Sequence, residues 1–212
     1  MELIRTANAG ILLKLDGKTI LLDGVCREVK PYPATPPELR EQLLENCPDL
    51  VAFTHNHKDH YDPAYAVDYV CRTGRVILGS KDVRGVNDQV TLDGVTVTPI
   101  PCRHIGAAGR EVEHFGFVVQ GSRCIWFTGD STPTAWRGNQ LPKPDVLVVP
   151  YAYVNTQESW KLTRSFGAEK VVLLHMPAKE ADTVDLWKMV EDTIGTDATV
   201  LIPEMGQCIC LR

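Results

Sequence analysis

The stretch Thr54-His55-Asn56-His57-Lys58-Asp59-His60-Tyr61-Asp62 contains three of the six histidines of the chain. Imidazole and carboxylate groups are common ligands of zinc and similar divalent ions. The apolar segment 50–53 before it favours a buried strand. Because residues two apart in an extended segment point to the same side, His55 and His57 can converge on one metal. Asp59 and His60 lie on the following turn, where they can serve a second ion. A solvated turn with incidental histidines explains this pattern poorly.

The order His-x-His-x-Asp-His resembles the signature of the metallo-β-lactamase superfamily. The resemblance implies an α/β fold, namely a four-layered αβ/βα sandwich of two mixed sheets flanked by helices, with one or two metals at its edge. The Gly10 region, the histidine motif and the turn Thr128-Gly129-Asp130-Ser131 look most like a small bacterial group that includes the ascorbate-6-phosphate lactonase.

Length and composition predict one globular domain over residues 1–212, with 44% hydrophobic and 23% charged residues and no linker-like segment. No apolar run approaches the roughly 18 residues of a membrane span, and no secretion signal begins the chain. We therefore expect a cytoplasmic protein with no membrane partner. The net charge of -5 argues against long nucleic acids as partners. The oligomeric state is left open.

The apolar runs predict many strands, with helices between them. A helix is expected over 37–46, with Thr35 as its N-cap, and another over 64–71, capped by Asp62. A third is expected over about 180–194. The Asp-Gly pairs at 16–17 and 93–94 predict hairpin turns. Strands are predicted at 3–6, 11–15, 19–22, 50–53, 75–78, 90–92, 95–100, 115–119, 123–127, 146–149, 171–174, 199–202 and 207–211.

The chain has seven scattered cysteines, which is an odd number. We expect them to be reduced thiols, as is usual in the cytoplasm. Cys208 and Cys210 alternate with apolar residues in a run that is typical of a terminal strand. Small buried side chains explain them better than metal ligands do.

Three further candidate ligands follow predicted strands, namely His104, Asp130 and His175. The family resemblance implies that His55, His57 and His104 bind one ion, that Asp59, His60 and His175 bind the other, and that Asp130 bridges the two. His114 competes with His104, and we prefer His104 because a Pro-Cys-Arg turn precedes it. Asp23, after the strand at 19–22, is expected to support the site structurally.

Several residues near the ligands are candidates for substrate contacts. Lys58, Arg103 and Arg110 can bind an anionic group, although they can equally be surface charges. His114 is a further candidate, as a pocket residue or proton donor. Tyr61, Tyr151 and Tyr153 line the pocket or simply pack in the core.

The predicted function is that of a hydrolase with two divalent metals, with zinc preferred and manganese or iron as alternatives. Such a pair holds a bridging hydroxide, and Asp59 would orient or deprotonate the water that supplies it. The substrate would be a small ester, lactone or phosphoester. A phosphodiesterase of nucleotides or nucleic acid is one alternative. A metal-binding protein without turnover is another.

Overall fold

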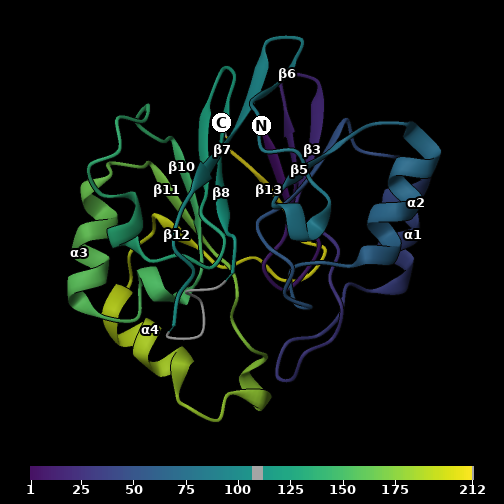
Figure 1. Cartoon of the computed structure of the whole chain (residues 1–212). Helices are drawn as coiled ribbons and strands as arrows, with labels where there is room; N and C mark the ends of the chain where they lie inside the picture. Colours follow the sequence, from purple (N-terminus) through teal and green to yellow (C-terminus); the bar gives the residue numbers. More distant parts are fainter. Residues whose placement is uncertain (107–111, 212) are drawn as a thin grey trace.

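Two β-sheets lie face to face in the middle of the molecule, and helices cover both outer faces (Figure 1). The computed structural model describes residues 1–106 and 112–211. Helices α1 (Pro37–Glu45) and α2 (Pro63–Thr73) flank the first sheet. Helices α3 (Gln157–Ser165) and α4 (Leu186–Ile194) flank the second. This is the four-layered αβ/βα sandwich that the sequence predicts.

The first sheet has six strands in the order β13-β1-β2-β3-β4-β5. Strands β1 to β3 form an antiparallel meander, whereas β3, β4 and β5 run parallel with a helix in each crossover. The strands are β1 (Glu2–Arg5), β2 (Ile11–Leu15), β3 (Lys18–Leu22), β4 (Leu50–Phe53), β5 (Ile77–Gly79) and β13 (Cys208–Cys210).

The second sheet has seven strands in the order β12-β11-β10-β9-β8-β7-β6. Neighbouring strands from β6 to β9 pair antiparallel, whereas β9 to β12 run parallel. The strands are β6 (Val90–Leu92), β7 (Val95–Pro101), β8 (Phe115–Gln120), β9 (Cys124–Phe127), β10 (Val146–Val149), β11 (Lys170–Leu173) and β12 (Val200–Leu201).

Three apolar clusters hold the layers together. The central cluster joins the facing sides of the two sheets and includes Leu13 and Phe117, both fully buried. The second packs the helices α3 and α4 on the second sheet, and the third packs α1 and α2 on the first. Successive side chains of a strand point to opposite faces of its sheet, so one set packs against the other sheet and the next set packs against the helices.

Both predicted Asp-Gly hairpin turns are present. Asp16 and Gly17 have φ values of 50° and 78°, and Asp93 and Gly94 have values of 43° and 95°. Positive φ at both central residues is the backbone that a two-residue hairpin requires, and it explains the choice of Asp-Gly.

The structure corrects two expectations about the helices and adds one helix. Thr35 does not cap α1, because its hydroxyl accepts a hydrogen bond from the Cys26 amide at 3.0 Å, and Pro36 stands at the N-cap. The predicted helix over 180–194 is a short 3₁₀ turn, Lys179–Ala181, followed by α4 from Leu186. Helix α3, which Thr156 caps, was not predicted at all. The Asp62 cap on α2 is confirmed by its bond to the Ala64 amide.

The cysteines are free thiols, as expected. Cys208 and Cys210 are exposed rather than buried, because β13 is an edge strand whose pairing with β1 leaves their side chains outside the core. In the part of the chain that the structure describes, no helix has the length and apolar character of a membrane span.

We predict that Phe117→Ala lowers the free energy of unfolding by about 3–5 kcal/mol, because the ring fills the space between the two sheets. Urea unfolding followed by circular dichroism measures the change. Val184→Ala is the matched control, since that side chain is 66% exposed. Equal stability of the two variants would contradict the position of Phe117 in the central core.

Candidate metal centre

The candidate ligands lie in loops that leave one edge of the sandwich. His55 follows β4 in the first sheet, and Asp130 and His175 follow β9 and β11 in the second. The carboxyl ends of parallel strands meet at one edge of a sheet, which is where ligands bind in α/β folds. His104 follows β7, which runs in the same direction as β9. The topology therefore brings residues that are 120 positions apart into one cluster.

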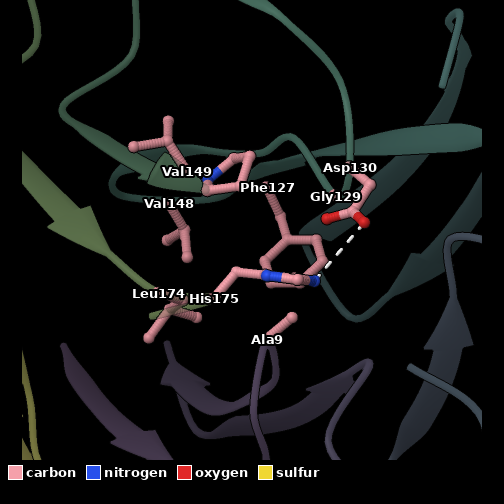
Figure 2. A pocket seen from close by; sticks show the side chains of 9 residues that line it. Ala9, Phe127, Gly129, Asp130, Val148, Val149, Leu174 and His175 are labelled. Atoms are coloured by element: carbon pink, nitrogen blue, oxygen red, sulfur yellow. Dashed lines mark ion pairs between the residues drawn. The ribbon is translucent and has the colours of Figure 1, made fainter. Parts of the chain in front are cut away.

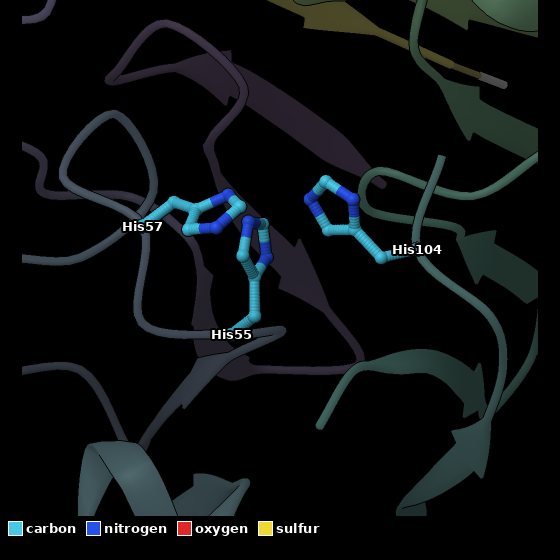
Figure 3. Close-up of side chains that lie close together, drawn as sticks. All are labelled: His55, His57 and His104. Atoms are coloured by element: carbon cyan, nitrogen blue, oxygen red, sulfur yellow. The ribbon is translucent and has the colours of Figure 1, made fainter. Parts of the chain in front are cut away.

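Three histidines converge from two loops, as Figure 3 shows. The rings of His55 and His57 are 4.4 Å apart, and each ring is 4.7 Å from that of His104. Their nitrogen ligand atoms lie within 4.8 Å of one another. This is a set of donors that one divalent ion can share.

A second group lies beside the first and contains Asp59, His60 and His175. His175 Nε2 is 3.2 Å from Asp59 Oδ2. Asp130 lies between the two groups: its carboxylate oxygens are 3.3 Å from His60 Nε2, 3.4 Å from His175 Nε2 and 3.7 Å from His104 Nε2. Figure 2 shows His175 and Asp130 pointing toward each other in a pocket whose lining includes the apolar Ala9, Phe127 and Leu174.

The donor atoms of this cluster fit a metal. The Nε2 atoms of His55, His60, His104 and His175 are buried and make no hydrogen bond of standard geometry, and the same holds for Asp130 Oδ1. Buried polar atoms are nearly always satisfied, so five such atoms that face one another indicate cations as their partners. No cysteine belongs to the groups of candidate ligands among the described residues.

Hydrogen bonds at Nδ1 orient three of the rings. His60 Nδ1 lies 2.8 Å from Asp23 Oδ2, and His104 Nδ1 lies 2.6 Å from the Ile105 carbonyl oxygen. The Thr54 hydroxyl donates to Asp23 and lies 2.9 Å from His55 Nδ1. Such partners hold the proton on Nδ1 and leave the Nε2 lone pair for a metal.

Asp23 therefore has the supporting position that the sequence predicts. Its carboxylate is fully buried and accepts hydrogen bonds from both the amide and the hydroxyl of Thr54. One carboxylate thus links the orientation of a ring in the first group to that of a ring in the second. The hydrogen bonds from Thr54 thus connect Asp23, which follows β3, to the histidine motif.

The backbone adopts uncommon conformations at this edge. His175 and Asp23 have φ values of 57° and 47°, in the left-handed region that non-glycine residues rarely occupy. Gly129, at φ 53°, lies so close to its neighbours that an added Cβ would be 2.7 Å from His114 Nε2. Strain of this kind is concentrated at functional sites.

The charges within the cluster favour ionised carboxylates. Burial opposes ionisation of Asp130, but the neighbouring His175 and His60 hold its pKa well below the usual value. Burial lowers the pKa of His175, yet Asp130 and Asp59 raise it to about 9. Burial holds the pKa of His55 well below its ordinary value. Asp130 therefore offers an anionic carboxylate and His55 a neutral imidazole, both of which suit a cation.

All seven predicted ligands lie in this cluster, whereas His114 does not offer a free nitrogen to it. Its Nε2 accepts a hydrogen bond from the Asp130 amide at 3.0 Å, and its Nδ1 lies 3.2 Å from Cys102 Sγ. Burial lowers the pKa of His114 to about 3. A substrate contact or proton transfer by His114 does not suit this environment, because the ring is 3% exposed and both nitrogens are engaged.

The other predicted contact residues differ in their surroundings. Lys58 and Arg103 are exposed next to ligands, and Arg110 lies outside the described residues. Tyr61 and Tyr153 pack in the apolar clusters. Tyr151 remains near the site, with its ring 6.0 Å from that of His175.

Tyr32 is a residue near the site that sequence reasoning missed. Its ring stands edge-on to His175, with centroids 4.5 Å apart. It belongs to the Pro-rich loop between β3 and α1, which has no motif that marks it as part of a site. Only the fold brings this loop to the metal-ligand cluster.

Comparisons with known proteins agree with this geometry. Residues 18–194 match the sequence model of the beta-lactamase superfamily domain. A UPF0173 metal-dependent hydrolase of Methanopyrus kandleri is 25% identical, over 98% of both chains. One of Methanoculleus marisnigri is 26% identical, over 79% of this chain and 84% of the relative.

Among solved structures, an isothiocyanate hydrolase from Delia radicum gut bacteria superposes with a TM-score of 0.73 at 20% identity, over 100% of this chain and 99% of that one. A possible metal-dependent hydrolase from Veillonella parvula gives a TM-score of 0.72 at 15% identity, with the same coverage. These likenesses support the sandwich fold. Together with the match over most of its length, they show that the chain belongs to the metallo-β-lactamase superfamily.

Proposed function

We propose that this protein is a metal-dependent hydrolase that holds two divalent cations and acts on a small ester, lactone or phosphoester. The observation that carries the proposal is the convergence of buried, unpartnered ligand atoms around one shared carboxylate, Asp130. Two relatives described as metal-dependent hydrolases support it.

The groups of potential ligand atoms overlap, because His55 and His60 also form a group with Asp130, and we assign them to two cations. His55, His57 and His104 would hold the first, and Asp59, His60 and His175 the second. Asp130 would contact both, since its oxygens face histidines of each group. Nitrogen and carboxylate ligands favour zinc. Manganese and iron also accept such ligands, and a structurally similar β-hydroxylase of Streptomyces venezuelae is a diiron protein.

When bound, such cations polarise the scissile group and lower the pKa of water toward neutrality. The protein must then place a base near that water. Asp59 suits this role because its side chain is 14% exposed, twice the 7% of Asp130, so that it can reach a molecule entering from solvent. Asp59 is therefore the proposed catalytic residue.

A cleft of about 420 Å³ next to His104 offers a place for the rest of the substrate. Its lining includes Arg103 and the hydroxyl-bearing Thr132 and Thr134. A guanidinium beside hydroxyl groups suits a phosphate or carboxylate. We therefore propose a small anionic substrate, with Arg103 as a contact and Lys58 as a second candidate.

We predict that His57→Ala and His175→Ala each reduce the zinc content of the purified protein from about two ions per chain to about one, because each removes a ligand of one cation only. Mass spectrometry of zinc-loaded, dialysed protein measures the content. The Cys208→Ser/Cys210→Ser double variant is the control and keeps two ions. Unchanged content in both histidine variants would contradict the ligand assignment.

We predict that Asp59→Ala lowers kcat by at least roughly 10²–10⁴-fold on any substrate that the parent hydrolyses, because the variant loses the positioned base together with a ligand of the second cation. The substrate screen contains phosphorylated lactones, phosphodiesters and nucleotides. It also contains an isothiocyanate, because one structurally similar protein hydrolyses that class. Binding of a partner or ligand without turnover in the parent would instead favour the non-catalytic alternative.

A further inference from the structure

His114 is a buried histidine directly behind the metal-ligand cluster. It immediately precedes β8, and its ring centroid is 5.1 Å from that of His55 and 5.5 Å from that of His104. None of the candidate ligand groups among the described residues includes it. Its position therefore calls for an explanation other than direct coordination.

The hydrogen bond between His114 and Asp130 fixes the state of the ring. The Asp130 amide lies 3.0 Å from His114 Nε2, and a backbone N–H can only donate. His114 Nε2 must therefore carry a lone pair, and the proton of the neutral ring must be on Nδ1. That nitrogen faces Cys102 Sγ at 3.2 Å.

His114 also joins the loops that carry ligands from both sheets. Its carbonyl oxygen accepts from the Cys102 amide at 3.1 Å, next to the loop that bears His104. The following residue, Phe115, donates its amide to the Thr54 carbonyl at the end of β4. The Asp130 carbonyl accepts from the Ile105 amide at 2.8 Å. Hydrogen bonds thus fix both the backbone N–H and the backbone carbonyl of Asp130, and His114 accepts the bond from the N–H.

Gly129 shows how closely the ring packs on this turn. An added Cβ at this position would lie 2.7 Å from His114 Nε2 and 2.7 Å from Thr54 Cγ2. With φ at 53°, the backbone is also in the region that favours glycine. The turn is therefore shaped to bring the Asp130 amide against the imidazole.

We propose that His114 is a positioning residue that acts through the backbone of Asp130 and fixes the carboxylate shared by the two cations. This inference rests on the proposed two-cation site. His114 binds no cation itself, because the nitrogen that would do so is already engaged by the Asp130 amide. Its ring serves as a neutral hydrogen-bond acceptor.

Two substitutions separate this role from simple filling of space. In His114→Gln the amide oxygen can reach the place of Nε2, whereas in His114→Asn it reaches only that of Nδ1. We expect the zinc affinity of His114→Gln to stay within about threefold of the parent, and that of His114→Asn to fall by roughly 10–100-fold, as for other residues that orient metal ligands. Competition with a chromophoric chelator measures both affinities.

Thermal unfolding of the zinc-free variants provides the structural control, since both lose the same ring. Equal zinc affinities in the two variants, whether both kept or both weakened, would overturn the proposal. A second measurement needs no variant: ¹⁵N nuclear magnetic resonance of the parent should show His114 protonated at Nδ1 and not at Nε2. An Nε2-protonated ring would also overturn it. Fewer than two zinc ions in the parent would refute the proposed function, while the ring tautomer would still test the contact with Asp130.

Discussion

The contact of one buried carboxylate with histidines from both sheets is the interaction on which the rest of this structure depends. Asp130 lies within 3.3 to 3.7 Å of three histidine nitrogens that come from the first and the second sheet. Neither sheet alone could assemble this group. The sandwich must pack so that the ends of β4, β7, β9 and β11 meet, and the apolar cluster between the sheets provides that packing.

Around this cluster, hydrogen bonds determine which atoms face the centre. Asp23 orients His60 and, through Thr54, also His55, so that one carboxylate supports ligands of both groups. On the opposite side, the Asp130 peptide is held by His114 and Ile105. The uncommon backbone at His175 and Gly129 belongs to the same arrangement. Pre-organised donors of this kind lower the cost of binding a cation.

Much of this arrangement could be predicted from local signals. Alternating apolar runs identify the strands, and the Asp-Gly pairs identify two hairpins. The histidine motif indicates the superfamily, which the family match confirms. Ligands such as His104 and His175 stand at strand ends, where parallel topology predicts that a site forms.

What could not be predicted depends on contacts between distant segments. The sequence pattern predicts Thr35 as a helix cap, but its hydroxyl accepts a hydrogen bond from the Cys26 amide, which only the folded loop brings near it. Tyr32 approaches His175 across more than 140 residues of chain. The Pro-Cys-Arg turn favours His104 over His114 as a ligand, but the role of His114 follows only from its contact with the Asp130 amide. Cys208 alternates with apolar neighbours, yet the edge position of β13 exposes it.

The most direct test of the account is a crystal structure of the zinc-loaded protein, with anomalous scattering recorded at the zinc edge. Two peaks are predicted, one among His55, His57 and His104 and one among Asp59, His60 and His175, with the Asp130 carboxylate contacting both. A single peak, or a pair of ions that Asp130 does not join, would contradict the shared carboxylate at the centre of the site.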